Sequence, residues 1–280
     1  MTHRTLPALS AILLFLVLGV AAPALPWGPR GHLLLNGYAL QNLPAPLQTA
    51  LRARADVVVQ MANAPDARKS TVAGEAERHF IDLDRYGSYP FTDVPREYTV
   101  LVQRYGEARV RANGLLPWTL VETTERLAAQ MRSRDPALWQ TAADLGHYAA
   151  DGNMPLHTTE NYNGQKTGNT GAHALFEEVL IDAFWRDAYF VPRPARAPAD
   201  LLAFVFDSLT ASYARIEPLL AAMTKAQAQF RRTDPRFFEL LWAEAGPTLR
   251  ESMNRAAFDI ASLWLAAWER AGRPDLLGSR

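Results

Sequence analysis

Apolar residues recur every three or four positions along most of the chain beyond residue 30, with charged residues between them. Such spacing puts the apolar side chains on one face of an α-helix. It predicts helices over residues 32–43, 47–61, 98–111, 117–132, 136–151, 172–188, 201–223 and 236–269. Because the alternating pattern of a half-buried strand is nearly absent, we expect an all-α protein with one multi-helix domain over residues 27–280.

Three stretches break this helical pattern. The residues around His79–Asp84 form a short apolar segment that fits either a strand or a helix, and a loop rich in glycine, proline and aromatic residues follows it. A polar loop covers residues 158–171 and is too poor in apolar residues to belong to the core. Prolines interrupt the pattern again at residues 192–198.

The first residues have the pattern of a secretory signal. A polar start with Arg4 is followed by an apolar run over residues 8–20 and then by small residues and prolines, which predicts a signal peptide over residues 1–26. The run is short for a membrane span, although an uncleaved leader that anchors the protein is the alternative. No later segment is uniformly apolar, so we expect a secreted or periplasmic protein without a transmembrane anchor after cleavage.

Charge and cysteine content narrow the chemistry. The 29 lysines and arginines equal the 29 aspartates and glutamates, so no global positive field attracts nucleic acid or an anionic membrane, and any binding of a polyanion is local. The chain has no cysteine, which excludes disulfides and thiolate ligands. A metal site must therefore use nitrogen and oxygen atoms.

The histidines are arranged as metal ligands. Of the six, only His3 lies in the leader. His147 and Asp151 are four residues apart on one predicted helix, and so are His173 and Glu177 on another, so each pair projects from one helix face and can hold one ion. One such pair is common on exposed helices. Two pairs, with His157 after an intervening turn, predict a site made of imidazole and carboxylate, which suits zinc.

Six short motifs carry a resemblance to a known family. In chain order they are Trp27-Gly28-Pro29-Arg30-Gly31-His32, Ala64-Pro65-Asp66, His79-Phe80-Ile81-Asp82, Gly146-His147-Tyr148-Ala149-Ala150-Asp151, Pro155-Leu156-His157 and His173-Ala174-Leu175-Phe176-Glu177. With these motifs the chain resembles the zinc-dependent phospholipase C and single-strand-specific nuclease superfamily over nearly all of its predicted mature length. The resemblance implies a helical domain with up to three zinc ions in a cleft.

The resemblance also implies the ligands of each ion. One zinc would be held by Asp66, His79, His147 and Asp151, with Asp151 bridging to a second ion. Another would be held by His157, His173 and Glu177. The remaining ion would take His32, Asp151, and the amino nitrogen and carbonyl of an N-terminal Trp27.

The Trp27 assignment requires cleavage directly before that residue, which puts Pro26 where a small residue is expected. Cleavage at Ala22-Pro23-Ala24 fits the small-residue rule better and would require further trimming or a different backbone ligand.

The implied chemistry is hydrolysis of a phosphate ester by zinc-activated water, without a protein nucleophile. Asp151 would act through its bridging position. Asp66 is a candidate to orient or deprotonate the water, although its role as a ligand competes with a role as a base. Asp82 would either support a ligand histidine or be an ordinary cap or surface acid.

Three functions are compatible with these residues. The leading hypothesis is phospholipase C-type cleavage of phospholipids, because the chain resembles the lipases of the superfamily at Glu177 and Asn161. The alternative is an endonuclease acting on single-stranded DNA or RNA, which the short Trp27–His32 spacing favours. Base-stacking aromatic residues in the cleft would support it. The loops beside the motifs carry residues that either line the substrate cleft or are ordinary loop packing: Tyr86, Tyr89, Phe91, Asn161 and Tyr162. The third is a non-catalytic, zinc-stabilised protein. No stable protein partner is implied.

Overall fold

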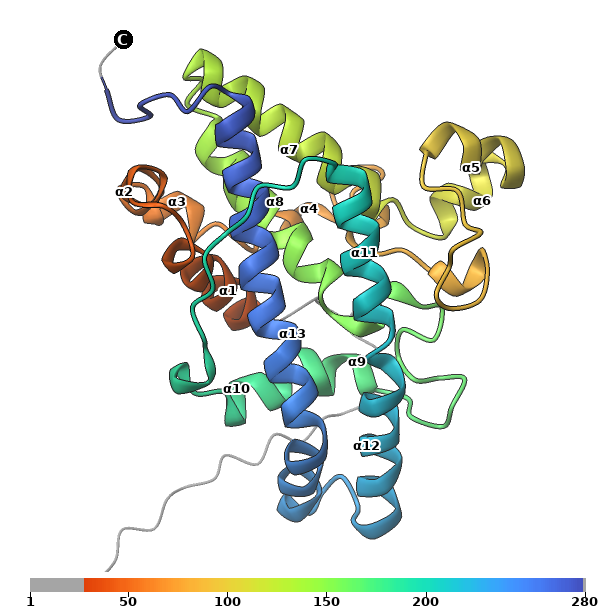
Figure 1. The fold of residues 1–280 in the computed structure, drawn as a ribbon. Helices are drawn as coiled ribbons and strands as arrows, with labels where there is room; N and C mark the ends of the chain where they lie inside the picture. The colour runs from red at the N-terminus through yellow and green to blue at the C-terminus, as the bar shows by residue number, and fades with distance from the viewer. Residues whose placement is uncertain (1–27, 279–280) are drawn as a thin grey trace, which may run out of the picture.

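The computed structural model describes residues 28–278, and every regular element in that range is helical (Figure 1). The prediction of an all-α fold is therefore confirmed. The predicted signal peptide and Trp27 lie outside the described residues. Between residues 28 and 278, no helix is both long enough and apolar enough to cross a membrane.

The longest helix, α13 (Pro235–Arg270), runs through the middle of the molecule (Figure 1). It begins where the Asp234 carboxylate accepts a hydrogen bond from the backbone N–H of Arg236, and Pro235 occupies the first turn. Helices α12 (Ile216–Gln229), α7 (Leu116–Ser133), α1 (Pro29–Gln41) and α8 pack around it. Its small residues allow this close packing: Ala256, Ala257 and Ala261 are fully buried.

Helix α8 (Leu138–Gly152) lies between α7, α13 and α1, and all of its residues except Gln140 are buried. It carries His147 and Asp151, so both of these candidate ligands are inside the protein. The N-terminal segment supplies α1, α2 (Ala45–Arg52), α3 (Ala55–Val58) and α4 (Ala64–Arg68). Of these helices, α1, α3 and α4 contact α8.

Several predicted helices are divided in the structure. Residues 47–61 form α2 and α3, and residues 98–111 form α5 (Tyr98–Tyr105) and α6 (Glu107–Ala112), which are separated by Gly106. The φ of Gly106 is 83°, a conformation outside any helix. Residues 201–223 belong to α11 (Leu201–Tyr213) and α12. The segment His79–Asp84 forms no strand and contributes to two 3-10 turns, Ala76–His79 and Leu83–Arg85.

Residues 172–184 depart from a regular α-helix. A short α9 (Ala172–Ala174) leads into a π-helical turn (Leu175–Val179) and then into α10 (Leu180–Phe184). The π-helical turn carries Glu177. Single π-helical turns are rare and are often found at functional sites.

Gly146 lets α8 approach α1 closely. A Cβ atom at this position would lie 2.1 Å from Oδ1 of Asn36 on α1. Asn36 is fully buried, and its Nδ2 donates to the carbonyl of Val58 at 2.8 Å, so it cannot move aside freely. The same contact between α1 and α8 brings His32 against His147, whose rings stack with centroids 3.8 Å apart.

We predict that Gly146→Ala lowers the free energy of unfolding by about 1–3 kcal/mol, the usual cost of overpacking a core. It should also displace His32 from Asp151 and weaken metal binding there. Urea unfolding and metal content of the purified variant measure both effects. Gly37→Ala is the matched control, because no atom lies within 4 Å of the added Cβ. A Gly146→Ala protein as stable as the Gly37→Ala protein would contradict this account.

Candidate metal centre

Three buried groups of histidine, aspartate and glutamate could each hold a metal ion. The first contains Asp66, His79 and His147, the second His157, His173 and Glu177, and the third His32, His147 and Asp151. Within each group the possible ligand atoms all lie within 4.8 Å of one another. The structure therefore brings together every sequence-predicted ligand that it describes.

The first group gathers around His147. Its Nε2 lies 3.1 Å from Nδ1 of His79, 3.5 Å from Oδ1 of Asp66 and 3.3 Å from Oδ2 of Asp151. Nδ1 of His79 is also 2.8 Å from Oδ2 of Asp151. Two ligands come from α8, one from α4 and one from the 3-10 turn Ala76–His79, so the group depends on the packing of these elements and not on one local motif.

The second group is formed by His157, His173 and Glu177. The two Nε2 atoms are 3.3 Å apart. Oε1 of Glu177 lies 2.8 Å from Nε2 of His157, and Oε2 lies 2.9 Å from Nε2 of His173. One carboxylate therefore contacts both imidazoles.

His32 forms the third group on the far side of Asp151. Its Nε2 is 3.5 Å from Oδ1 of Asp151, the oxygen that does not contact His79. Nε2 of His147 has a single lone pair and can bind one ion only, so the two groups that share His147 cannot both use it. If His147 serves the ion beside Asp66, His32 and Asp151 remain for another. Trp27, which the resemblance adds to that ion, is not among the described residues.

Backbone carbonyls determine which nitrogen of three histidines points into the groups. Nδ1 of His147 contacts the carbonyl of Ala62 at 2.8 Å, Nδ1 of His157 contacts that of His79 at 2.7 Å, and Nδ1 of His173 contacts that of Tyr162 at 3.0 Å. A carbonyl only accepts, so each Nδ1 carries the proton and donates it. In the neutral rings each Nε2 then presents a lone pair to the group, as a metal ligand does.

These groups hold many acceptors and few donors. Oδ1 of Asp151 and both oxygens of Glu177 are buried, and they accept no hydrogen bond among the described residues when the facing Nε2 atoms carry no proton. The spacings fit a cation: two ligands at 2.0–2.1 Å from a tetrahedral zinc ion lie about 3.4 Å apart, and the contacts within the first two groups range from 2.8 to 3.7 Å. The donor set and its geometry are thus suited to a metal ion.

Protonation compensates for the buried carboxylates when no metal is bound. Burial by itself would raise the pKa of Asp151, but the imidazoles of His147 and His157 hold it well below its usual range. Burial would lower the pKa of His147, yet the carboxylates of Asp151 and Asp66 raise it to about 10. For His32, burial followed by repulsion from His147 lowers the pKa to about 3. The pocket therefore retains positive charge, which a metal can replace.

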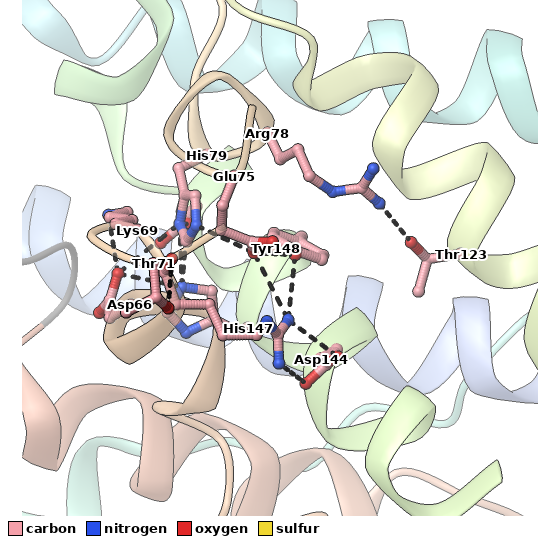
Figure 2. A network of polar contacts seen from close by, with 12 residues as sticks. Asp66, Lys69, Thr71, Glu75, Arg78, His79, Thr123, Asp144, His147 and Tyr148 are labelled. Atoms are coloured by element: carbon pink, nitrogen blue, oxygen red, sulfur yellow. Dashed lines mark hydrogen bonds and ion pairs between the residues drawn. The ribbon is translucent and has the colours of Figure 1, made fainter. Parts of the chain in front are cut away.

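Glu75 supports His79 from the side away from the metal groups. His79 points Nδ1 toward Asp66 and Asp151, whereas its Nε2 faces Oε1 of Glu75 at 3.6 Å. The same oxygen accepts a hydrogen bond from the hydroxyl of Tyr148. Figure 2 shows Glu75 and Tyr148 on one side of His79, with Asp66 and His147 on the other. This separation is longer than a hydrogen bond, so Glu75 acts on the orientation of the His79 ring through the attraction between its charge and the imidazole.

Glu75 and Lys69 were not predicted as site residues from the sequence. Glu75 lies four residues before His79, a spacing equal to that of His147 and Asp151. Lys69 places its Nζ 2.7 Å from Oδ1 of Asp66, so a fixed positive charge borders the first group. Its spacing of three residues from Asp66 was a usable signal, although such pairs are common on helix surfaces.

Asp82 is a partly exposed acid that precedes the 3-10 turn Leu83–Arg85 without capping it through its side chain. Its carboxylate makes no hydrogen bond within residues 28–278, and Glu75 supports His79 instead. Burial, then the nearby charges of Asp84 and Glu160, raise the pKa of Asp82 to about 7.

The loop aromatic residues divide into two classes. Tyr86 and Phe91 are buried and belong to the core. Tyr89 and Tyr162 are exposed, with 55% and 52% of their surface accessible. The Tyr162 ring lies edge-on to His173 at a centroid distance of 6.1 Å, so an exposed aromatic side chain stands beside the second metal group.

A scan against known protein families finds no match to this chain, and a search of curated proteins finds none either.

We predict that Glu75→Gln weakens metal binding at the group containing His79 by about 10- to 100-fold, the usual effect of losing an outer carboxylate. Competition with a chromophoric chelator measures the affinity. Glu77→Gln is the control, because Glu77 lies in the 3-10 turn that carries His79 but pairs with Arg111. Equal affinity in the two folded variants would show that Glu75 does not support His79.

Asp82 should make stability depend on pH. Its raised pKa means that the folded protein keeps a proton that the unfolded chain releases, so the free energy of unfolding falls as pH rises from about 4 to about 7. Asp82→Asn removes this loss. Its advantage over the wild type should grow across that window to at most about 4 kcal/mol, reduced by the partial exposure of the carboxylate. Urea unfolding at several pH values tests this, and parallel curves for the two proteins would refute it.

Proposed function

We propose that this protein is an exported zinc-dependent phosphodiester hydrolase, with phospholipase C-type cleavage of phospholipids as the leading activity. The observation that carries the proposal is the convergence of histidine lone pairs and buried carboxylates, with their orientation fixed by backbone carbonyls. Imidazole and carboxylate ligands without thiolate suit zinc. The six motifs that resemble the phospholipase C and nuclease superfamily supply the reaction class.

Bound zinc ions would provide an activated water and positive charge for the phosphate oxygens. The residues of the chain hold and orient this centre. Asp151 directs one oxygen toward His79 and the other toward His32, the arrangement of a bridging carboxylate. Contacts with His147 overcome the effect of burial and lower the pKa of Asp66 below its usual range, which favours Asp66 as a ligand over Asp66 as a base. Lys69 adds a positive charge that can contact the substrate phosphate.

The preference for a phospholipid rests on Glu177, the residue that the resemblance assigns to the lipases. Exposed Tyr162 beside His173 favours the second candidate, a nuclease acting on single-stranded DNA or RNA, because an aromatic ring can stack on a base. The same ring could also contact the quaternary ammonium of a choline head group. Direct comparison of substrates is therefore needed.

The decisive experiment measures zinc content and hydrolysis on one purified sample, with phosphatidylcholine vesicles, single-stranded DNA and a chromogenic phosphodiester offered in parallel. We expect up to three zinc ions per chain and cleavage that stops on chelation and returns with zinc. Preference for vesicles supports the lipase, and preference for DNA supports the nuclease. Zinc without cleavage of any substrate would favour a zinc-stabilised protein without turnover, and absence of bound metal would refute the proposal.

We predict that Asp151→Asn lowers hydrolysis at least about 100-fold, because the amide cannot bridge two ions as a carboxylate does. Initial rates and zinc content are measured together. Asp259→Asn is the matched control: Asp259 is also buried, but it bonds to Ser208, Asn153 and Arg255 away from the metal groups. Circular dichroism confirms that both variants fold. Full activity and full zinc content in Asp151→Asn would contradict the bridging role.

A further inference from the structure

A polar cavity lies beside Glu75 and Tyr148. Its volume is about 560 Å³, and its lining includes neither His79 nor any other candidate metal ligand. The lining residues are Arg68, Val72, Ala73, Gly74, Glu75, Arg78, Arg111, Leu115, Arg126, Gln130, Thr141, Asp144 and Tyr148. Part of this wall is visible in Figure 2, where Arg78, Tyr148 and Asp144 lie beyond Glu75 as seen from the metal groups.

Four guanidinium groups from four different elements reach the cavity. Arg68 ends α4, Arg78 lies in the 3-10 turn Ala76–His79, Arg111 lies in α6, and Arg126 lies in α7. The lining contains only two carboxylates, those of Glu75 and Asp144, so its net charge is +2. A positively charged cavity in a chain of zero net charge is a local feature of this surface.

One arginine, Arg68, pairs with both carboxylates of the lining. Arg68 binds the two oxygens of Asp144 at 3.0 and 3.3 Å, and its Nη2 lies 3.4 Å from Glu75. Both carboxylates are nearly buried, with side-chain exposures of 10% and 6%. Both carboxylates of the cavity are therefore paired with Arg68. The carboxylates that pair with Arg78, Arg111 and Arg126 lie elsewhere.

The carboxylate partners of those three arginines lie outside the lining. Arg78 and Arg126 share Glu122, whose side chain is 59% exposed, at 3.3 and 3.9 Å. Arg111 pairs with the partly exposed Glu77. Surface pairs of this kind contribute at most about 1 kcal/mol each. An anion in the cavity can therefore compete for these guanidiniums at small cost.

Gln130 adds an unmet hydrogen bond to the same wall. Its Oε1 is buried and has no hydrogen-bond partner in the part of the chain that the structure describes. Leaving such an acceptor unpaired costs about 1–3 kcal/mol. Gln130 itself lines the cavity, so the wall combines the positive charge of the arginines with a neutral polar side chain.

We propose that this cavity binds a phosphomonoester of a small organic molecule. A phosphate monoester carries a charge of about −1.5 to −2 and forms bidentate bonds with guanidinium groups, which matches the lining charge of +2. The cavity is within the size range of sites for small organic ligands and exceeds the needs of phosphate alone. The choice of a phosphomonoester rests on the proposed function, since hydrolysis of a phosphodiester yields one. The binding of phosphate follows from the arginines alone.

Calorimetric titration of the zinc-loaded protein with inorganic phosphate, phosphocholine and adenosine monophosphate tests the proposal. The metal centre can also bind phosphate, so the Arg111→Gln/Arg126→Gln double variant is compared with the wild type at equal zinc content. We expect two binding events in the wild type and loss of one in the double variant, with affinity for that event at least tenfold weaker. Tighter binding of phosphocholine would indicate a phosphomonoester from a lipid head group, and tighter binding of adenosine monophosphate would indicate one from a nucleic acid.

Arg132→Gln is the matched control, because Arg132 lies on α7 outside the lining and bonds to the carbonyl of Arg270. Melting temperatures verify that all variants fold. Identical titrations of the wild type and the double variant, or a single event in the wild type that persists in the variant, would overturn the proposal. Because binding is measured without turnover, a protein that binds phosphate here but hydrolyses no substrate would refute only the proposed activity.

Discussion

The buried carboxylates of Asp151 and Glu177 are the constraint on which the centre of this protein depends. Neither has access to solvent, and several of their oxygens lack a hydrogen-bond donor among the described residues. A charge in such surroundings is tolerated only when positive charge lies beside it. The imidazoles around them meet this need by binding protons, and a shared cation would meet it equally. Folding and metal binding would then be coupled through the same atoms.

The helical fold was predictable because burial and helix periodicity act over whole segments. Helix α8 is the clearest case, since its apolar and small residues leave no face for solvent. The divisions of the other helices were harder to predict. A glycine at positive φ separates α5 from α6, whereas α13 continues through Gly246 and Pro247 because neighbouring helices hold it in place. Tertiary packing decides whether a helix breaks or continues at such a residue. The spacing of apolar residues along the sequence does not reveal that packing.

The ligands were predictable to different degrees. The pairs His147–Asp151 and His173–Glu177 follow from spacing, although the second pair lies on a π-helical turn and not on a regular α-helix. Asp66 was identified only through the resemblance, since its proximity to His147 arises from the packing of α4 against α8. The choice of nitrogen in each imidazole depends on carbonyls distant in sequence, such as Ala62 for His147, and no local pattern encodes it.

The chain order of these elements matters during synthesis. The described candidate ligands lie between His32 and Glu177, whereas the helix at the centre of the core spans Pro235–Arg270. A ribosome therefore releases these imidazoles and carboxylates before the helix that supports them exists. An incomplete chain could capture a metal ion in non-native arrangements, since unfolded histidines also bind metals. If these groups hold a metal ion, correct loading has to wait until α13 packs against α8, and metal capture is then a late step in the maturation of the protein.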